Sequence, residues 1–70
     1  MKKTTKQTQQ KPRAKLIGEN GNVFNLLAIA SRALKAAGRG DEATEMGNRG
    51  MSSASFDEVL SIIGEYVDIR

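Results

Sequence analysis

The side chains available for chemistry in this chain are mainly carboxylates, amines and guanidinium groups, because it contains no His and no Cys. Without cysteine there are no disulfides, thiolate zinc sites or cysteine nucleophiles. Without histidine, the commonest general base and the commonest transition-metal ligand are also missing. Glu65 and Asp68 are spaced to share one helix face and could hold a hard cation weakly, but a solvated face explains them better. No base is placed to activate a serine, so we expect no enzyme, no metal site and no cofactor.

Positive charge gathers at the start of the chain. Residues 1–15 carry six basic residues and no acid, a charge of +6, whereas residues 16–70 carry five bases and eight acids, a charge of −3. Such a segment favours phosphate contacts, which are weak, salt-dependent and blind to base sequence when no aromatic side chain is present to stack. The expected nucleic-acid contacts are Lys2, Lys3, Lys6, Lys11, Arg13, Lys15 and Arg49.

Two Gly-x-x-Gly sequences could also contact nucleic-acid phosphates. The run Ile17-Gly18-Glu19-Asn20-Gly21 resembles the loop of KH domains, which clamps a nucleic-acid backbone between two helices. However, Glu19 would repel phosphate and no helix precedes the loop, so a turn that leads into a helix is the better interpretation. The second run, Gly47-Asn48-Arg49-Gly50, has a favourable charge and is expected between two helices, where a loosely structured turn is the simpler interpretation.

A short strand and three helices are expected to position these residues. Residues 1–14 contain only Met1 and Ala14 as apolar residues, which predicts a disordered basic arm, and residues 15–70 are expected to form one small domain. The strand is expected at Lys15-Leu16-Ile17. The following Gly- and Asn-rich segment is expected to turn into a helix, although Asn20-Gly21 could instead close a hairpin.

The first expected helix covers residues 23–37, with Asn22 as its N-cap and Gly38 beyond its end. Its apolar surface, which includes Phe24, is unusually wide. Such a surface suits either a central helix that is contacted from two sides or a homodimer contact.

The second expected helix covers about 42–49, is capped by Asp41, and is kept short or frayed by Gly47 and Gly50. The third covers 56–66 and starts with a capping box. In this motif the Ser55 hydroxyl accepts from the Glu58 amide, and the Glu58 carboxylate accepts from the Ser55 amide. The side chains expected on its buried face are Phe56, Val59, Leu60, Ile63 and Val67. The chain end from Tyr66 to Ile69 is rich in β-formers and could pair with the first strand.

Two stretches carry a resemblance to a known group. They run from Lys15 through Phe24 to Gly38, and from Ser55 through Leu60 to Ile69. Residues 15–70 resemble short, uncharacterised bacterial proteins that are carried by prophages and other mobile elements. The resemblance transfers no activity and no functional residue, but it implies an accessory gene product that inhibits or modulates a host or element-encoded protein.

We therefore expect a mainly α (α+β) small single domain of three helices with a short N-terminal strand after the arm. The expected function is a non-enzymatic interaction module that binds a protein partner or a second copy of itself. The alternative is a nucleic-acid-associated protein that uses its basic arm for weak, nonspecific phosphate contacts. No segment approaches the roughly 20 apolar residues of a membrane span, and no apolar signal region follows the basic start, so we expect a cytoplasmic location.

Overall fold

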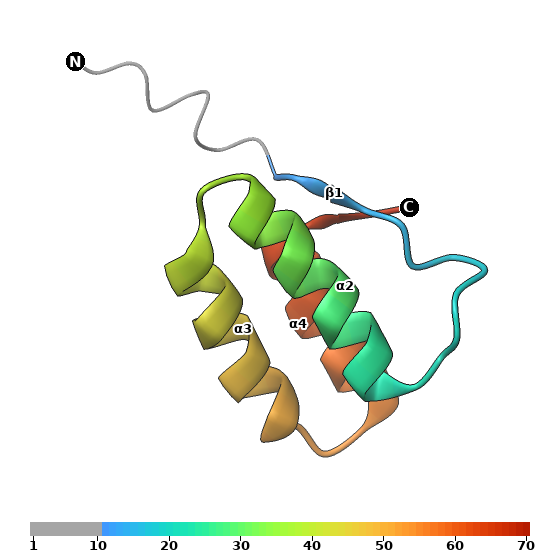
Figure 1. Ribbon diagram of the computed structural model, residues 1–70. Coiled ribbons are helices and arrows are strands. Elements are labelled where there is room, and N and C mark those ends of the chain that lie inside the picture. Colours follow the sequence, from blue (N-terminus) through green and yellow to red (C-terminus); the bar gives the residue numbers. More distant parts are fainter. Residues whose placement is uncertain (1–10) are drawn as a thin grey trace.

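The computed structural model describes residues 11–70 and contains three helices and a two-stranded sheet (Figure 1). The elements in chain order are β1 (Arg13–Ala14), α2 (Val23–Ala36), α3 (Gly40–Met51), α4 (Phe56–Tyr66) and β2 (Asp68–Ile69). The expected mainly α fold with a small strand pair is therefore confirmed. The disordered arm predicted for residues 1–14 lies outside the described residues as far as residue 10.

The two strands run parallel and join the start of the described chain to its end. The Asp68 amide donates to the Pro12 carbonyl at 2.8 Å, and the Arg70 amide donates to the Ala14 carbonyl at 2.9 Å. The predicted pairing of the ends is thus present, but β1 lies at 13–14 rather than at 15–17. Ala14 is also buried in the core, so the folded part begins before residue 15. Ala14, an apolar residue in an otherwise polar segment, is thus part of the core and pairs with Ile69.

Helix α2 starts and ends close to the expected residues. The Asn22 side chain accepts a hydrogen bond from the Phe24 amide at 2.8 Å, and Gly38 beyond the helix has a φ of +79°. That left-handed conformation is the one in which glycine ends helices without strain. The helix packs against α3, α4 and β1, so much of its wide apolar surface is covered within the chain.

Helix α3 differs from its prediction in length and capping. It begins at Gly40 and ends at Met51, and its N-cap is Arg39 without a side-chain cap hydrogen bond. Asp41 therefore lies in the first turn, where its charge still favours the helix dipole. The Gly47–Gly50 run lies inside the helix and not between two helices. The cost of its glycines is offset by packing against α2, which propensity arguments do not include.

Helix α4 covers Phe56–Tyr66 as predicted, and its capping box is present with one change of partner. The Glu58 amide donates to the Ser55 hydroxyl at 3.1 Å. The Glu58 carboxylate accepts from the Ala54 amide at 2.7 Å, one residue earlier than the usual capping-box partner. Both bonds hold the first turn of α4 in place.

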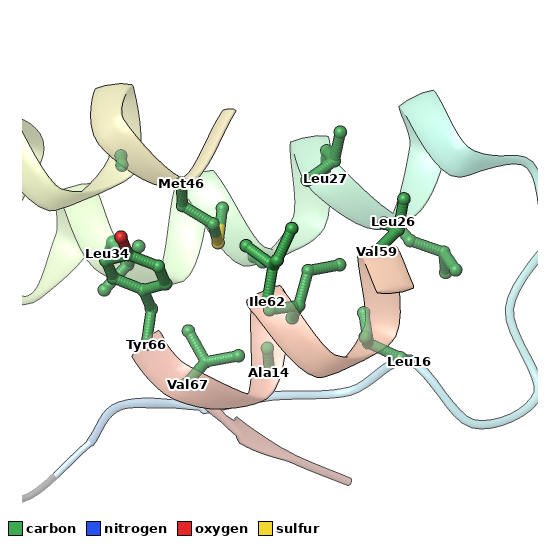
Figure 2. Packing of buried hydrophobic residues seen from close by; sticks show 13 residues of the cluster. Ala14, Leu16, Leu26, Leu27, Leu34, Met46, Val59, Ile62, Tyr66 and Val67 are labelled. Carbon is green, nitrogen blue, oxygen red and sulfur yellow. The ribbon is translucent and has the colours of Figure 1, made fainter. Parts of the chain in front are cut away.

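The core lies between the three helices and is closed by β1 and the residues that follow it (Figure 2). Its most deeply buried large side chains are Leu34, Met46, Ile63 and Val67. The predicted inward face of α4 is confirmed at Val59, Ile63 and Val67. It is wrong at Phe56, which is exposed, and Leu60 is only partly buried.

Two buried residues of α4 were not predicted, Ile62 and Tyr66. The helix is rotated so that the stripe through 59, 62, 63 and 66 faces α2 and α3. A helical period identifies an apolar stripe but does not distinguish it from its neighbour when both contain apolar residues. Among residues 11–70, no helix is both long and apolar enough to cross a bilayer.

Candidate functional site

The start of α2, the end of α3 and the start of α4 lie at the same end of the helical bundle (Figure 1). Large apolar side chains are exposed on these elements and on the segment that precedes α2. The exposed fractions are 71% for Ile17, 64% for Phe24, 59% for Met51 and 44% for Phe56. We call these four residues the apolar end. Phe56 was predicted on the buried face of its helix, and that expectation is wrong. Phe24, expected on the wide apolar surface of residues 23–37, is also exposed.

Two shallow grooves meet within the apolar end. The first runs between α2, α3 and the start of α4, and its lining includes Phe24, Met51 and Phe56. The second runs between the segment that precedes α2 and the α4 helix, and its lining includes Ile17, Phe56 and Leu60. Phe56 lines both grooves. The two grooves thus connect the four exposed side chains through Phe56.

Local hydrogen bonds hold the backbone beneath these side chains. The Asn20 side chain accepts from the Asn22 amide at 2.9 Å, and the Asn25 side chain donates to the Asn20 carbonyl at 3.0 Å. These bonds and the Asn22 cap define the turn that leads to Phe24. The Ser53 hydroxyl donates to the Gly50 carbonyl at 2.7 Å and shapes the connection to α4. Both aromatic residues thus sit on the first turns of capped helices, which limits the entropy that binding would cost.

Acidic residues lie in and close to the two grooves, while Lys15 stands two residues before Ile17 on the preceding segment. Glu19 lines the second groove, and Asp57 and Glu58 follow Phe56 on the exposed first turn of α4. Neither groove is lined by a lysine or an arginine. A bound segment would therefore meet apolar side chains bordered by carboxylates.

The predicted nucleic-acid contacts do not form a single group. Lys2, Lys3 and Lys6 lie outside the described residues. Lys11, Arg13 and Lys15 are exposed along β1 and its flanks, whereas Arg49 lies on α3 and faces α4.

Arg49 is engaged within the fold. Its guanidinium donates to both carboxylate oxygens of Glu65, at 2.7 Å from Nη1 to Oε1 and 3.1 Å from Nη2 to Oε2. Nη1 also donates to the Tyr66 hydroxyl at 3.1 Å, and the guanidinium carbon lies 5.8 Å from the centroid of that ring. This two-pronged contact joins α3 to α4. Hydrogen bonding to Glu65 raises the pKa of Arg49, and the same contact lowers the pKa of the Glu65 carboxyl.

The lowered pKa of Glu65 predicts a loss of stability in acid. A carboxyl whose pKa is lower in the folded than in the unfolded state stabilises the fold above its ordinary pKa of about 4.3. That contribution is lost as the pH falls through the folded-state pKa. We expect Glu65→Gln to unfold at lower urea concentration than the wild type at pH 7, with the difference shrinking towards pH 3. Glu45→Gln, at an exposed position on α3, is the control and should change little. An unchanged difference at pH 3 would contradict the assignment.

The two carboxylates that could have shared a cation have basic partners instead. Glu65 pairs with Arg49, and the Asp68 carboxylate lies 2.7 Å from the Arg70 guanidinium. Residues 11–70 contain no group of three or more acidic side chains arranged to hold a metal ion.

No protein-family model matches this chain, and neither a curated protein nor a solved structure matches it. The resemblance to proteins of mobile elements stays a prediction. Evidence for function therefore comes from the chain's own surfaces.

Sequence reasoning missed the apolar end because it assigned large apolar side chains to the core by default. One signal was present, since Phe24 and Phe56 each stand within two residues of a helix N-cap. The first turn of a helix lies at the boundary of a small bundle, where no further element need cover it.

Proposed function

We propose that this chain is a non-enzymatic interaction module that binds a protein partner through its apolar end. The proposal rests on one observation: Ile17, Phe24, Met51 and Phe56 are exposed and joined by grooves that share Phe56. Contiguous exposed apolar surface of this kind marks interaction sites in small proteins. Aromatic residues and methionine are the types enriched in interface cores.

The carboxylates around the apolar end favour a particular partner chemistry. A segment with large apolar side chains for the two grooves and with Lys or Arg beside them would complement Glu19, Asp57 and Glu58. A second copy of this chain fits less well. A two-fold contact through the apolar end would place the carboxylates of both copies within one interface. We therefore favour a different protein over a homodimer.

The resemblance to prophage and mobile-element proteins supports a role in the cytoplasm. The partner would then be a host or element-encoded protein whose activity is modulated by occupation of a basic, apolar segment. Burial of that segment against Phe24 and Phe56 would block or alter the activity of the partner.

Selection of peptides from a phage-displayed random library on the immobilised full chain tests this function. We expect enriched peptides to combine large apolar residues with Lys or Arg. Synthetic copies of those peptides should bind at least tenfold more weakly to the double variant Phe24→Ala/Phe56→Ala, because truncating central aromatic anchors costs about 2 kcal/mol or more. Both positions are exposed, so the variant should keep the wild-type circular dichroism spectrum.

The matched control is Lys35→Ala/Glu45→Ala, which truncates two exposed side chains elsewhere on the chain and should leave binding unchanged. Enrichment of acidic peptides, or binding that survives the aromatic truncations, would contradict the proposal. Sedimentation of the wild type at micromolar concentration adds a separate check. A dimer that dissociates in the aromatic variant would show that a second copy is the occupant.

A further inference from the structure

The chain entering the domain presents its basic residues in a regular row. Lys11, Arg13 and Lys15 are exposed, whereas Ala14 and Leu16 between and beside them are buried. This alternation is the period of an extended strand, in which every second side chain points to the same face. We call Lys11, Arg13 and Lys15 the basic row.

Backbone hydrogen bonds hold the row extended beyond the two residues of β1. The carbonyls of Pro12 and Ala14 accept from Asp68 and Arg70, and the Leu16 amide donates to the Arg70 carbonyl at 2.7 Å. Side chains two residues apart on such a strand are separated by about 6.6 Å, or two rises of about 3.3 Å. Lys11 is held further by a hydrogen bond from its ammonium group to the Gly64 carbonyl at 2.8 Å.

The neighbouring strand adds positive charge beside the row. Arg70 follows β2 and lines an open groove together with Lys11 and Arg13. Asp68 also lines this groove, but its carboxylate is bound by the Arg70 guanidinium at 2.7 Å. Four basic side chains and one acidic side chain thus leave a net charge of +3 on this face (4 − 1). Lys2, Lys3 and Lys6 precede the row in the sequence and extend the same charge.

We propose that the basic row and Arg70 bind the phosphate backbone of a nucleic acid. A fixed row of like charges at regular spacing suits a polymer that carries one negative charge on every repeating unit. The groove is lined by no aromatic residue, so binding should involve phosphates and not stacked bases.

The groove beside the basic row is separate from the two aromatic residues of the apolar end, although Ile17 follows Lys15 by two residues. The groove beside Lys11 borders Gly64 near the last turn of α4, whereas Phe56 starts that helix. Eight residues of helix correspond to about 12 Å. Arg49, the remaining predicted contact, lies on α3 and not on the strand pair, and its Nη1 and Nη2 atoms donate to Glu65 and Tyr66.

Fluorescence anisotropy with labelled mixed-sequence DNA of about 20 nucleotides, single-stranded and duplex, tests the proposal on the full chain. At low salt we expect Arg13→Gln/Lys15→Gln to bind duplex at least tenfold more weakly than the wild type. The slope of log affinity against log salt should become shallower by about 2, because each lost phosphate contact removes about 0.9.

The control Arg32→Gln/Lys35→Gln removes the same charge from two exposed positions on α2 and should have a much smaller effect. A triple variant, Lys2→Gln/Lys3→Gln/Lys6→Gln, should weaken DNA binding. In this background the further loss of affinity caused by Arg13→Gln/Lys15→Gln should still be measurable. Equal losses in the two double variants would overturn the proposal. So would displacement of the DNA by poly-glutamate of equal charge at the same concentration, since acidic protein would then serve as well as phosphate.

Discussion

Replacing Ile63 by alanine should lower the free energy of unfolding by about 2–5 kcal/mol. Ile63 is fully buried and is one of the four largest side chains in the centre of the core. A domain of 70 residues has a total stability of only about 3.5–10 kcal/mol. A loss at the upper end of the expected range would leave the variant mostly unfolded at room temperature if the wild-type stability lies at the lower end of its range. Urea unfolding followed by circular dichroism measures the difference.

The matched control is Leu60→Ala in the same helix. Leu60 is only partly buried and borders the second groove of the apolar end, so fewer of its contacts lie in the core. We expect a loss clearly smaller than that of Ile63→Ala. If the two variants lost equal stability, the rotation of α4 about its axis would be assigned wrongly.

The second large effect is expected where α2 and α3 approach each other. A Cβ atom placed on Gly50 would lie 2.9 Å from Cδ2 and 3.1 Å from Cδ1 of Leu27. Leu27 is itself buried, which limits how far it can move. We expect Gly50→Val to lower the free energy of unfolding by about 1–3 kcal/mol, the usual cost of overpacking a core. This loss should outweigh the gain in helix propensity from removing a glycine.

Gly47 provides the control, because it lies three residues earlier in the same helix. A Cβ at Gly47 would meet nothing within 4 Å. Gly47→Val should therefore leave stability within about 0.5 kcal/mol of the wild type or raise it slightly. Thermal unfolding of the two variants side by side measures the difference. Equal stabilities would mean that α2 and α3 do not pack closely at Gly50.

These two glycines also show what the Gly-x-x-Gly pattern means in this chain. The run was expected to form a loosely structured turn between two helices, yet residues 47–50 are helical throughout. Gly50 gives α2 room to approach, and Arg49 beside it ties α3 to α4 through Glu65. A motif that resembled a phosphate-binding loop is thus used for helix packing.

The amino-acid sequence by itself determined the features that depend on neighbours along the chain. Asn22 and Ser55 accept hydrogen bonds from amides within three residues, so the starts of α2 and α4 could be predicted. The bounds of α4 followed from its cap and its apolar period. The split between a basic start and an acidic remainder is a property of composition and needs no structure.

Only the tertiary structure decided which apolar side chains lie inside. Phe24 and Phe56 are as apolar as any core residue, but they lie at an end of the bundle that no other element of residues 11–70 covers. Ala14 lies in a polar segment and is nevertheless buried, because β2 from the far end of the chain pairs with it. Arg49 pairs with Glu65, 16 residues further along the chain, for the same reason. The burial of a side chain and the partner of a charged group depend on residues that are distant in the sequence. A local sequence pattern does not show where those residues lie in the fold.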